Sequence, residues 1–231
     1  MSTIADNIDL VSQRIRAAAD AVQRDASSIH LLAVSKTKPA QAVREAFAAG
    51  ARDFGENYLQ EALGKQAELT DLPLSWHFIG PIQSNKTRAI AENFDWVHSV
   101  DRLKIAQRLS EQRPADLPPL NICIQVNVSG EASKSGCSPA DLPALADAIS
   151  ALPRLTLRGL MAIPEPTDDR AEQDAAFATV RVLQAGLNLP LDTLSMGMSH
   201  DLESAIAQGA TWVRIGTALF GARDYGQPAN G

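Results

Sequence analysis

The sequence predicts an α/β fold, a single (β/α)8 barrel of the TIM type with an extra helix at its N-terminus. Eight short apolar segments of strand length alternate with segments of helical periodicity. The apolar segments are nearly continuous, which is typical of parallel strands covered on both faces. No Pro-, Gly- or Ser-rich linker divides the 231 residues, so we expect one domain over residues 1–231 with its core at about residues 4–225. An open, doubly wound sheet is the alternative architecture.

The first predicted element is an N-terminal amphipathic helix, because apolar residues recur there at helical spacing. These residues are Ile4, Ile8, Val11, Ile15, Ala19 and Val22. The eight predicted strands that follow are residues 29–35, 53–55, 76–80, 96–100, 121–128, 155–163, 194–197 and 212–215. Their helices are predicted at 39–49, up to 69, 84–92, up to 112, 138–152, 170–185 and 201–208, with a last turn after Gly216. Pro39 and Gly50 suit the two ends of the first of these helices.

Composition and charge argue against several classes of protein. Apolar residues make up 45% of the chain and charged residues 21%, which is ordinary for a globular protein. The net charge is −6 and no dense run of Lys or Arg occurs, which argues against sequence-independent nucleic-acid binding. No apolar stretch approaches the roughly 20 residues that span a bilayer. The N-terminal segment lacks the apolar core of a signal peptide, so we expect a cytoplasmic protein.

The cysteines and histidines do not predict a metal site. Cys123 and Cys137 lack metal-type spacing, and a disulfide framework is not expected. Cys123 belongs to an apolar strand, where a thiol packs as a small core residue. The four histidines include no pair at i, i+4, so a histidine in a strand is interpreted as a core residue whose polar atoms are satisfied.

In a parallel barrel the functional residues lie at the carboxyl ends of the strands, where the βα loops meet. The polar residues that follow the predicted strands are Lys36, Glu56, Asn57, Gln83 to Lys86, Ser99, Asp101, Asn127, Ser129, Glu165, Ser199, Arg214, Gly216 and Thr217. Asp101 and Glu165 are single loop carboxylates, which are usually solvated. The loop at residues 83–86 is expected at the same end of the barrel. Whether it contacts a cofactor, solvent or a partner protein is left undecided.

Lys36 ends an apolar strand, which would place its amino group in a partly desolvated mouth. Desolvation lowers the pKa of a lysine and favours the nucleophilic amine. The alternative is a side chain that extends into solvent, as many lysines do at strand ends. Lys38 directly precedes Pro39 and is expected to be solvated.

The loops after the seventh and eighth strands have the composition of a phosphate site, which barrels often place there. They cover residues 195–199 (SMGMS) and 214–218 (RIGTA). Glycine permits close backbone approach, hydroxyl groups donate hydrogen bonds, and free amides at a helix start hold an anion. The alternative for Ser199 is a plain helix N-cap before Asp201. A lysine amine opposite a phosphate cradle suits pyridoxal 5′-phosphate (PLP), which carries an aldehyde and a phosphate.

Six segments then give a resemblance that covers nearly the whole chain, from about Ile4 to Tyr225. They are residues 33–39 (AVSKTKP), 54–58 (FGENY), 76–86 (WHFIGPIQSNK), 159–164 (GLMAIP), 197–201 (GMSHD) and 213–221 (VRIGTALFG). With these motifs the chain resembles the PLP homeostasis protein family, which shares its barrel with the N-terminal domain of alanine racemase. Within them, His200 occupies a variable position.

The resemblance implies roles for eight residues. Lys36 would carry PLP covalently as a Schiff base, the internal aldimine. Ser199, Gly216 and Thr217 would hold the phosphate, and Arg214 would face the pyridine nitrogen. The remaining residues are Asn57 near the ring and Met161 and Met198 around the pocket. For each methionine, plain core packing is the alternative interpretation.

The resemblance also implies that the protein is not an enzyme. A protonated Arg214 leaves the ring nitrogen unprotonated, which makes PLP a weaker electron sink. Alanine racemases add a second base on a separate β-domain, and this chain ends soon after Gly221. We therefore expect a protein of vitamin B6 homeostasis that binds, carries or buffers PLP.

Two other functions stay open at this point. One is a PLP-dependent amino-acid racemase that uses Lys36, and the other is a barrel enzyme that acts on a phosphorylated metabolite without PLP. The expected partners are PLP itself and PLP-dependent apo-enzymes. We expect a monomer that binds neither nucleic acid nor membrane, and no metal.

Overall fold

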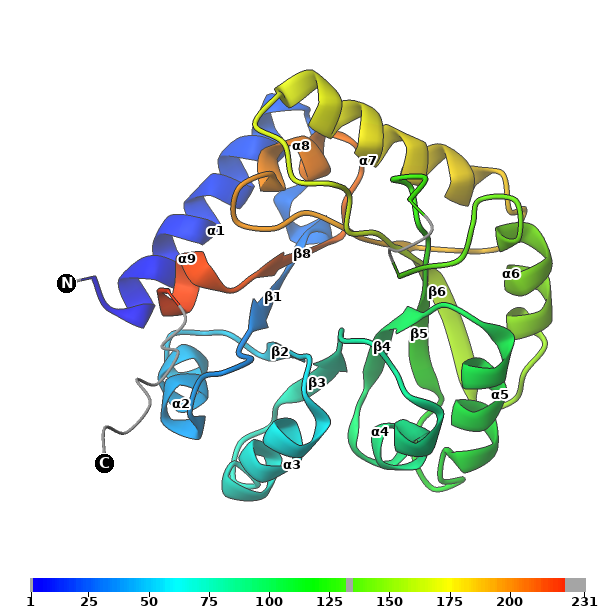
Figure 1. Ribbon diagram of the computed structural model, residues 1–231. Coiled ribbons are helices and arrows are strands. Elements are labelled where there is room, and N and C mark those ends of the chain that lie inside the picture. Colours follow the sequence, from blue (N-terminus) through cyan, green and yellow to red (C-terminus); the bar gives the residue numbers. More distant parts are fainter. Residues whose placement is uncertain (1, 132–134, 223–231) are drawn as a thin grey trace, which may run out of the picture.

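Eight parallel strands close into a barrel in chain order, and helices surround it (Figure 1). The structure, a computed structural model, describes residues 2–131 and 135–222. The strands are β1 (His30–Val34), β2 (Asp53–Glu56), β3 (Ser75–Phe78), β4 (Trp96–Val100), β5 (Leu120–Gln125), β6 (Leu155–Met161), β7 (Thr193–Ser195) and β8 (Trp212–Ile215). Because β8 pairs with β1, the predicted α/β barrel is confirmed and the open sheet is excluded.

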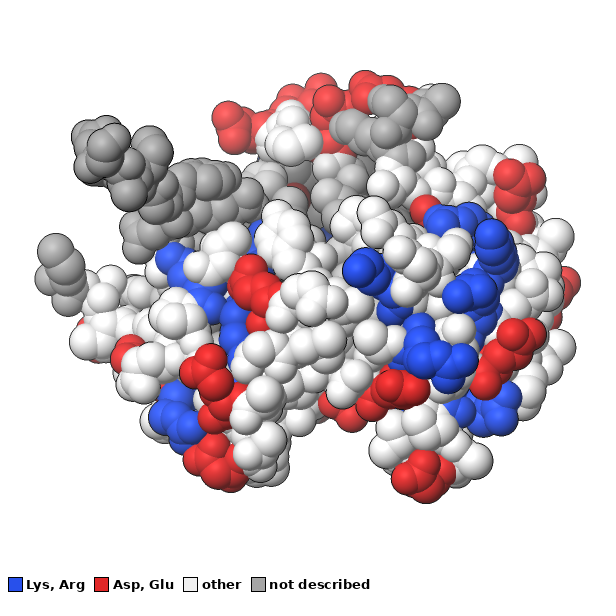
Figure 2. Space-filling model, turned by 60° about the horizontal axis from the view of Figure 1, so that its bottom comes forward, with Lys and Arg blue, Asp and Glu red and all other residues white. Residues whose placement is uncertain are grey.

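The helices alternate with the strands as the sequence predicts. They are α1 (Ile4–Ala21), α2 (Ala40–Ala48), α3 (Leu59–Glu68), α4 (Thr87–Asn93), α5 (Leu103–Gln112), α6 (Leu142–Ser150), α7 (Arg170–Ala185), α8 (Leu202–Ala207) and α9 (Thr217–Phe220). Two 3-10 turns, η1 (Ala26–Ser28) and η2 (Ser84–Lys86), complete the described elements. On the face drawn in Figure 2, acidic and basic side chains are interspersed, with a denser group of Lys and Arg at one side.

Helix α1 is the extra N-terminal helix, and it lies on the outside of the barrel beside α8, α9 and α2 (Figure 1). A capping box of Thr3 and Asp6 starts it. The side-chain amide of Asn7 donates to the carbonyl oxygen of Leu219 in α9 at 2.8 Å. Helix α9 has only four residues and is too short to cover the outer face of the barrel next to it. Helix α1 covers the rest of that face.

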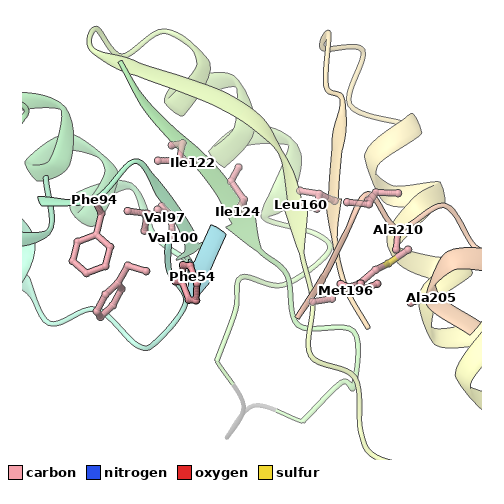
Figure 3. Close-up of a cluster of buried hydrophobic side chains, with 14 of the residues drawn as sticks. Phe54, Phe94, Val97, Val100, Ile122, Ile124, Leu160, Met196, Ala205 and Ala210 are labelled. Atoms are coloured by element: carbon pink, nitrogen blue, oxygen red, sulfur yellow. The ribbon is translucent and has the colours of Figure 1, made fainter. Parts of the chain in front are cut away.

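The hydrophobic core has two layers. Side chains that point out of the barrel pack beneath the helices, as Val97, Ile122 and Leu160 do (Figure 3). A second cluster is made of Leu32, Val34, Ile79, Trp96, Cys123, Met161 and Trp212. Neighbours along one strand belong to different layers because successive side chains of a strand point to opposite faces. Inward-pointing residues therefore alternate with these packed outer positions.

Several predicted boundaries differ from the structure, and two of the larger differences have clear local reasons. Strand β5 ends at Gln125 rather than residue 128, because Asn127 turns to the loop at Cys137 and donates its N–H to the Cys137 carbonyl oxygen at 2.8 Å. Helix α6 begins at Leu142 rather than residue 138. Before it, the Ser138 hydroxyl accepts a hydrogen bond from the Asp141 N–H, which forms a turn instead of a helix.

Cys123 and Cys137 are free thiols and both are buried. Burial raises the pKa of Cys123 to about 12 and that of Cys137 to about 11. Among residues 2–131 and 135–222, no group of three or more His, Cys, Asp or Glu is placed to bind a metal ion. None of the helices in this part of the chain combines the length and apolarity needed to cross a membrane.

Candidate functional site

A pocket of about 250 Å³ opens at the carboxyl ends of the strands. Its lining consists of Val34, Lys36, Asn57, Ile79, Ile163, Met198, Ser199, His200, Arg214, Gly216 and Thr217. Seven of the eight residues predicted to bind a cofactor are in this set. They come from the ends of β1, β2, β7 and β8, which the closed barrel brings to one mouth.

The eighth predicted residue, Met161, is not part of the pocket lining. It is fully buried and belongs to the apolar cluster that includes Trp96 and Trp212. Other polar residues at strand ends also lie outside the lining. Asp101 pairs with the guanidinium of Arg102 at 3.0 Å, and Glu165 lines a separate cavity.

The backbone on both sides of Lys36 is held by ionic groups, and those before Lys36 are buried. The Ser35 hydroxyl donates to Glu56 Oε1 at 2.7 Å, and the Ser35 carbonyl oxygen accepts from Lys65 Nζ at 2.6 Å. Lys65 Nζ also lies 2.7 Å from Glu56 Oε1, and both side chains are buried. Burial raises the pKa of Glu56, and the Lys65 charge opposes that shift.

The second half of this support holds the residue after Lys36. Glu61 Oε1 accepts the Thr37 N–H at 2.6 Å and pairs with Lys65 Nζ at 2.7 Å. Thr37 has a φ of +64°, a conformation that costs energy for a β-branched residue. Helix α3, which carries Glu61 and Lys65, therefore fixes the turn that presents Lys36 to the pocket.

Asn57 supplies an acceptor atom to the same pocket. Its Oδ1 is buried and has no hydrogen-bond partner within the described residues. Buried polar atoms are nearly always hydrogen-bonded, so this atom fits a donor from a bound ligand. Asn57 reaches its position because Gly80 lies against it, where a Cβ would collide with the Asn57 backbone.

The loop after β7 is tied down at several points. Arg14 of α1 donates to the Ser199 carbonyl oxygen at 2.9 Å and pairs with Glu203 at 2.8 Å. The Met198 N–H donates to Asp201 Oδ1 at 2.6 Å. Ser199 does not cap α8, whose N-cap is Asp201; its hydroxyl instead lies 3.4 Å from the Ala218 N–H at the start of α9.

Gly216 faces the pocket from the other loop. Its N–H has no acceptor within the described residues, which leaves a donor available to an anion. A Cβ at this position would lie 3.4 Å from the Val34 Cβ and carbonyl oxygen, which is ordinary contact, and its φ is negative. The fold itself therefore does not require glycine here, and the absent side chain leaves room at the pocket.

Arg214 lines the pocket although its side chain is nearly fully buried. Nη1 donates to the Ser195 hydroxyl at 2.9 Å, and Nη2 donates to the Ala162 carbonyl oxygen at 3.0 Å. Burial lowers the pKa of Arg214 to about 10, against the opposing charge of Asp201. The guanidinium is thus protonated at neutral pH and can only donate hydrogen bonds.

Four lining residues were missed by the sequence reasoning: Val34, Ile79, Ile163 and His200. Val34 at the end of β1 and Ile79, directly after β3, belong to the inner apolar cluster, and the two-residue period of β1 places Val34 on the same side as Lys36. His200 is half exposed, with Nε2 3.4 Å from Asp201 Oδ2. The apolar side chains of Val34, Ile79, Ile163 and Met198 line the pocket together with its amine, amide and guanidinium groups.

The donor set fits a ligand that combines a carbonyl and an anionic group. A lysine amine can attack a carbonyl carbon, the Gly216 N–H and the Ser199 hydroxyl can donate to an anion, and the apolar side chains of the lining can pack against a ring. PLP carries all three features, so the residues present fit this cofactor.

Comparisons with known proteins agree on the family. A family model of the alanine racemase N-terminal domain matches residues 8–224. A pyridoxal phosphate homeostasis protein of Pseudomonas aeruginosa is 78% identical over 230 residues, with 100% of both chains covered. Its counterpart of the same name in Escherichia coli K12 is 55% identical, over 97% of this chain and 99% of the other.

Solved structures show the same fold. PipY of Synechococcus elongatus, solved with PLP bound, is 46% identical with a TM-score of 0.83, and the match covers 95% of this chain and 100% of PipY. The alanine racemase of Corynebacterium glutamicum is 19% identical with a TM-score of 0.69. That match covers 98% of this chain and 63% of the racemase, and it supports the barrel fold alone.

Proposed function

This chain belongs to the pyridoxal phosphate homeostasis protein family, within the wider family of the alanine racemase N-terminal domain, and on that premise we propose that it binds PLP at Lys36 and serves PLP homeostasis. The observation that carries the proposal is the convergence of Lys36, Asn57, Arg214 and Gly216 on one pocket. The solved PLP complex of PipY supports the choice of ligand.

Each polar group of the pocket has a part in holding the cofactor. Lys36 would provide the covalent attachment, because α3 fixes the backbone on both sides of it. Ser199, Gly216 and Thr217 would hold the phosphate between the two loops. Asn57 Oδ1 would accept a hydrogen bond from a ligand donor, and Met198 would pack against the cofactor. Met161 would support the pocket from within the apolar cluster behind it.

The same residues disfavour turnover of amino acids. When bound, PLP supplies an electron sink for carbanion chemistry, and that sink is strong only with a protonated ring nitrogen. Arg214 is protonated at neutral pH, so it would donate to the ring nitrogen of bound PLP and disfavour protonation of that atom. Besides Lys36 and Arg214, His200 is the only titratable side chain that the described residues contribute to the pocket lining. Efficient racemisation needs a base on each face of the substrate, and we infer that this pocket binds and releases PLP instead.

Location and assembly follow from the same proposal. We infer a cytoplasmic protein, where PLP-dependent apo-enzymes are the candidates to receive the cofactor. Six large apolar side chains are exposed in the described part of the chain, two of them on α1 and its C-cap and the others on different segments: Leu10, Val22, Tyr58, Leu117, Ile163 and Val182. Such isolated residues form no obvious oligomer surface, which supports a monomer.

The test of this function is a comparison of turnover with exchange. The PLP-loaded protein is incubated with a panel of L- and D-amino acids, and products are resolved by chiral chromatography. We expect no steady racemisation, while PLP passes to an added apo-enzyme. A rate of about 1 s⁻¹ or more, lost in Lys36→Ala, would make the protein a racemase. If His200→Ala also removed that rate, His200 would be the second base.

A further inference from the structure

A hydrogen-bonded chain of five side chains runs through the interior of the barrel. Arg214 Nη1 lies 2.9 Å from Ser195 Oγ, and Ser195 Oγ lies 2.7 Å from His98 Nδ1. His98 Nε2 lies 2.9 Å from His77 Nδ1, and His77 Nε2 lies 3.0 Å from Asp53 Oδ1. These residues come from β8, β7, β4, β3 and β2, so the chain crosses the barrel from the pocket toward its opposite end. We call it the Arg214–Asp53 chain.

The middle of this chain is sealed from solvent. Ser195, His77 and His98 are fully buried, whereas the Asp53 side chain is 29% exposed at the first residue of β2. The His77 ring stacks on Trp96 with ring centres 5.5 Å apart, and Trp212 packs against both histidines. Barrel interiors are usually filled by Val, Ile and Leu, which need no partners. A buried polar chain instead requires every member to be satisfied.

The charged residues at the two ends, Arg214 and Asp53, determine which atom donates in each hydrogen bond of the chain. Arg214 can only donate, so Ser195 Oγ accepts its hydrogen. The Ser195 hydroxyl can then donate to His98 Nδ1, which is the direction that the Asp53 carboxylate sets from the other end of the chain. With Nδ1 as the acceptor, a neutral His98 carries its hydrogen on Nε2 and donates to His77 Nδ1.

The far end agrees with this direction. His77 then carries its hydrogen on Nε2 and donates it to the Asp53 carboxylate, with the Ser75 hydroxyl 3.2 Å away as a second neighbour. The reverse direction would set a bare nitrogen of His77 against the carboxylate, two acceptors 3.0 Å apart. Burial lowers the pKa of both histidines, which keeps them neutral as this pattern requires.

We propose that Ser195, His98, His77 and Asp53 are positioning residues that hold Arg214 in the orientation in which it meets the cofactor. The guanidinium is fixed by Ser195 on one nitrogen and by the Ala162 carbonyl oxygen on the other, which directs its remaining N–H groups. Ser195 is itself oriented by His98, and His98 by His77. The assignment of Arg214 to PLP rests on the proposed function; the direction of the chain does not.

The first test needs no cofactor and no substitution. Two-dimensional ¹⁵N–¹H spectra of histidine-labelled protein distinguish a hydrogen on Nε2 from one on Nδ1. We expect both His77 and His98 to be neutral with the hydrogen on Nε2. A hydrogen on Nδ1 of His98 would overturn the proposal, because Ser195 could then not be oriented as the link to Arg214.

The second test reads the position of Arg214 through PLP. His98→Leu removes the acceptor for Ser195, whereas His98→Asn keeps an acceptor oxygen close to the position of Nδ1. We expect His98→Leu to shift the absorption band of bound PLP and to weaken PLP binding about tenfold, the size of one lost bond to a charged group. His98→Asn should restore most of the wild-type spectrum. The matched control is Cys137→Ala, at a buried thiol outside the cluster that contains Val34 and Ile79 of the pocket, which should leave the spectrum unchanged.

The outcomes separate this inference from the function on which it rests. A wild-type spectrum in His98→Leu, with PLP still on Lys36, would overturn the positioning role alone. Failure of wild-type protein to take PLP on Lys36 would instead overturn the proposed function. If His98→Leu does not fold, Ser195→Ala removes only a hydroxyl group and carries the same expected shift. Ser204→Ala, at a buried serine of α8 bonded to Gln173, is its control.

Discussion

Two glycines beside the pocket, Gly197 and Gly216, have different reasons to be glycine. Gly197 has a φ of +97°, and a Cβ on it would lie 2.5 Å from the Cβ of Ala205. Gly216 has a negative φ and would place a Cβ in ordinary contact with Val34. The fold therefore requires the first glycine, whereas the second is not required by the fold and is the one proposed to leave room for the ligand.

This difference predicts that replacement by alanine affects stability at Gly197 and PLP binding at Gly216. Gly197→Ala should lower the free energy of unfolding by more than about 1 kcal/mol, because the backbone conformation and the packing both oppose a side chain. Gly216→Ala should change that free energy little but weaken PLP binding, since the methyl group occupies the phosphate side of the pocket. Urea unfolding and PLP titration of both variants measure the two effects. Equal PLP affinity in Gly216→Ala and wild type would place the phosphate elsewhere.

The candidate residues could be predicted from sequence because strand ends are readable and the barrel brings them together. Lys36, Asn57 and Gly216 come within two residues of a strand end, and Ser199 lies in the loop after β7. Lys65 could not be predicted, because a Glu61–Lys65 pair at i, i+4 has the spacing of an ordinary surface ion pair. The link between His98 and Ser195 was equally hidden, since 97 residues separate them and only the closed barrel makes them neighbours.

Helix α3 supports the site through a buried ion pair rather than through the pocket itself. Lys65 of α3 contacts Glu56 at the end of β2 and the Ser35 carbonyl oxygen after β1. Removing one partner of a buried pair leaves an uncompensated charge, which costs about 3–5 kcal/mol. We expect Lys65→Met to destabilise the fold by about that amount and to weaken PLP binding, because the turn before Lys36 loses its support.

A second substitution separates charge from packing. Adding Glu56→Gln to Lys65→Met removes the stranded carboxylate and should recover part of the lost stability, as measured by urea unfolding. The exposed pair of Arg44 and Asp71 is the control, and Arg44→Met should have a much smaller effect. An additive double variant would show that Glu56 and Lys65 do not act as a pair.

At the level of elements, the order of strands and helices was predictable from the periodicity of apolar residues. The boundaries at β5 and α6 were not. Val126 is a residue type that favours strands, but it forms an isolated β-bridge with Cys137 of the following loop. The periodicity of the sequence around Val126 does not predict this contact. Ser138 is a residue type that favours a helix start, yet its hydroxyl forms hydrogen bonds with Asp141 within a turn.

The whole molecule should lose stability in mild acid because it buries two neutral histidines. Burial lowers the pKa of His77, against the opposing pull of Asp53, and lowers that of His98 well below the usual 6.5. In the unfolded chain both groups take up protons near pH 6.5, so the unfolded state gains more as the pH falls. This part of the stability is present above pH 6.5 and is lost toward the lower folded-state pKa values.

The size of this effect is up to about 1.4 kcal/mol per pH unit for each histidine that charges only on unfolding. Urea unfolding between about pH 7.5 and pH 5 measures it. The double variant His77→Gln/His98→Gln should have a flatter dependence on pH over this range. An unchanged slope in the double variant would show that other groups carry the acid sensitivity.

The central claim, that the pocket holds PLP on Lys36, is tested most directly by borohydride reduction followed by peptide mapping. Lys38 lines a small cavity next to Lys36 and is the natural competitor, which makes Lys38→Ala the matched control. We predict that the reduced cofactor is found on the peptide that contains Lys36, that Lys36→Ala abolishes both the label and the near-visible absorption, and that Lys38→Ala retains both. A label found mainly on Lys38, Lys65 or Lys86, or one that persists in Lys36→Ala, would contradict the claim.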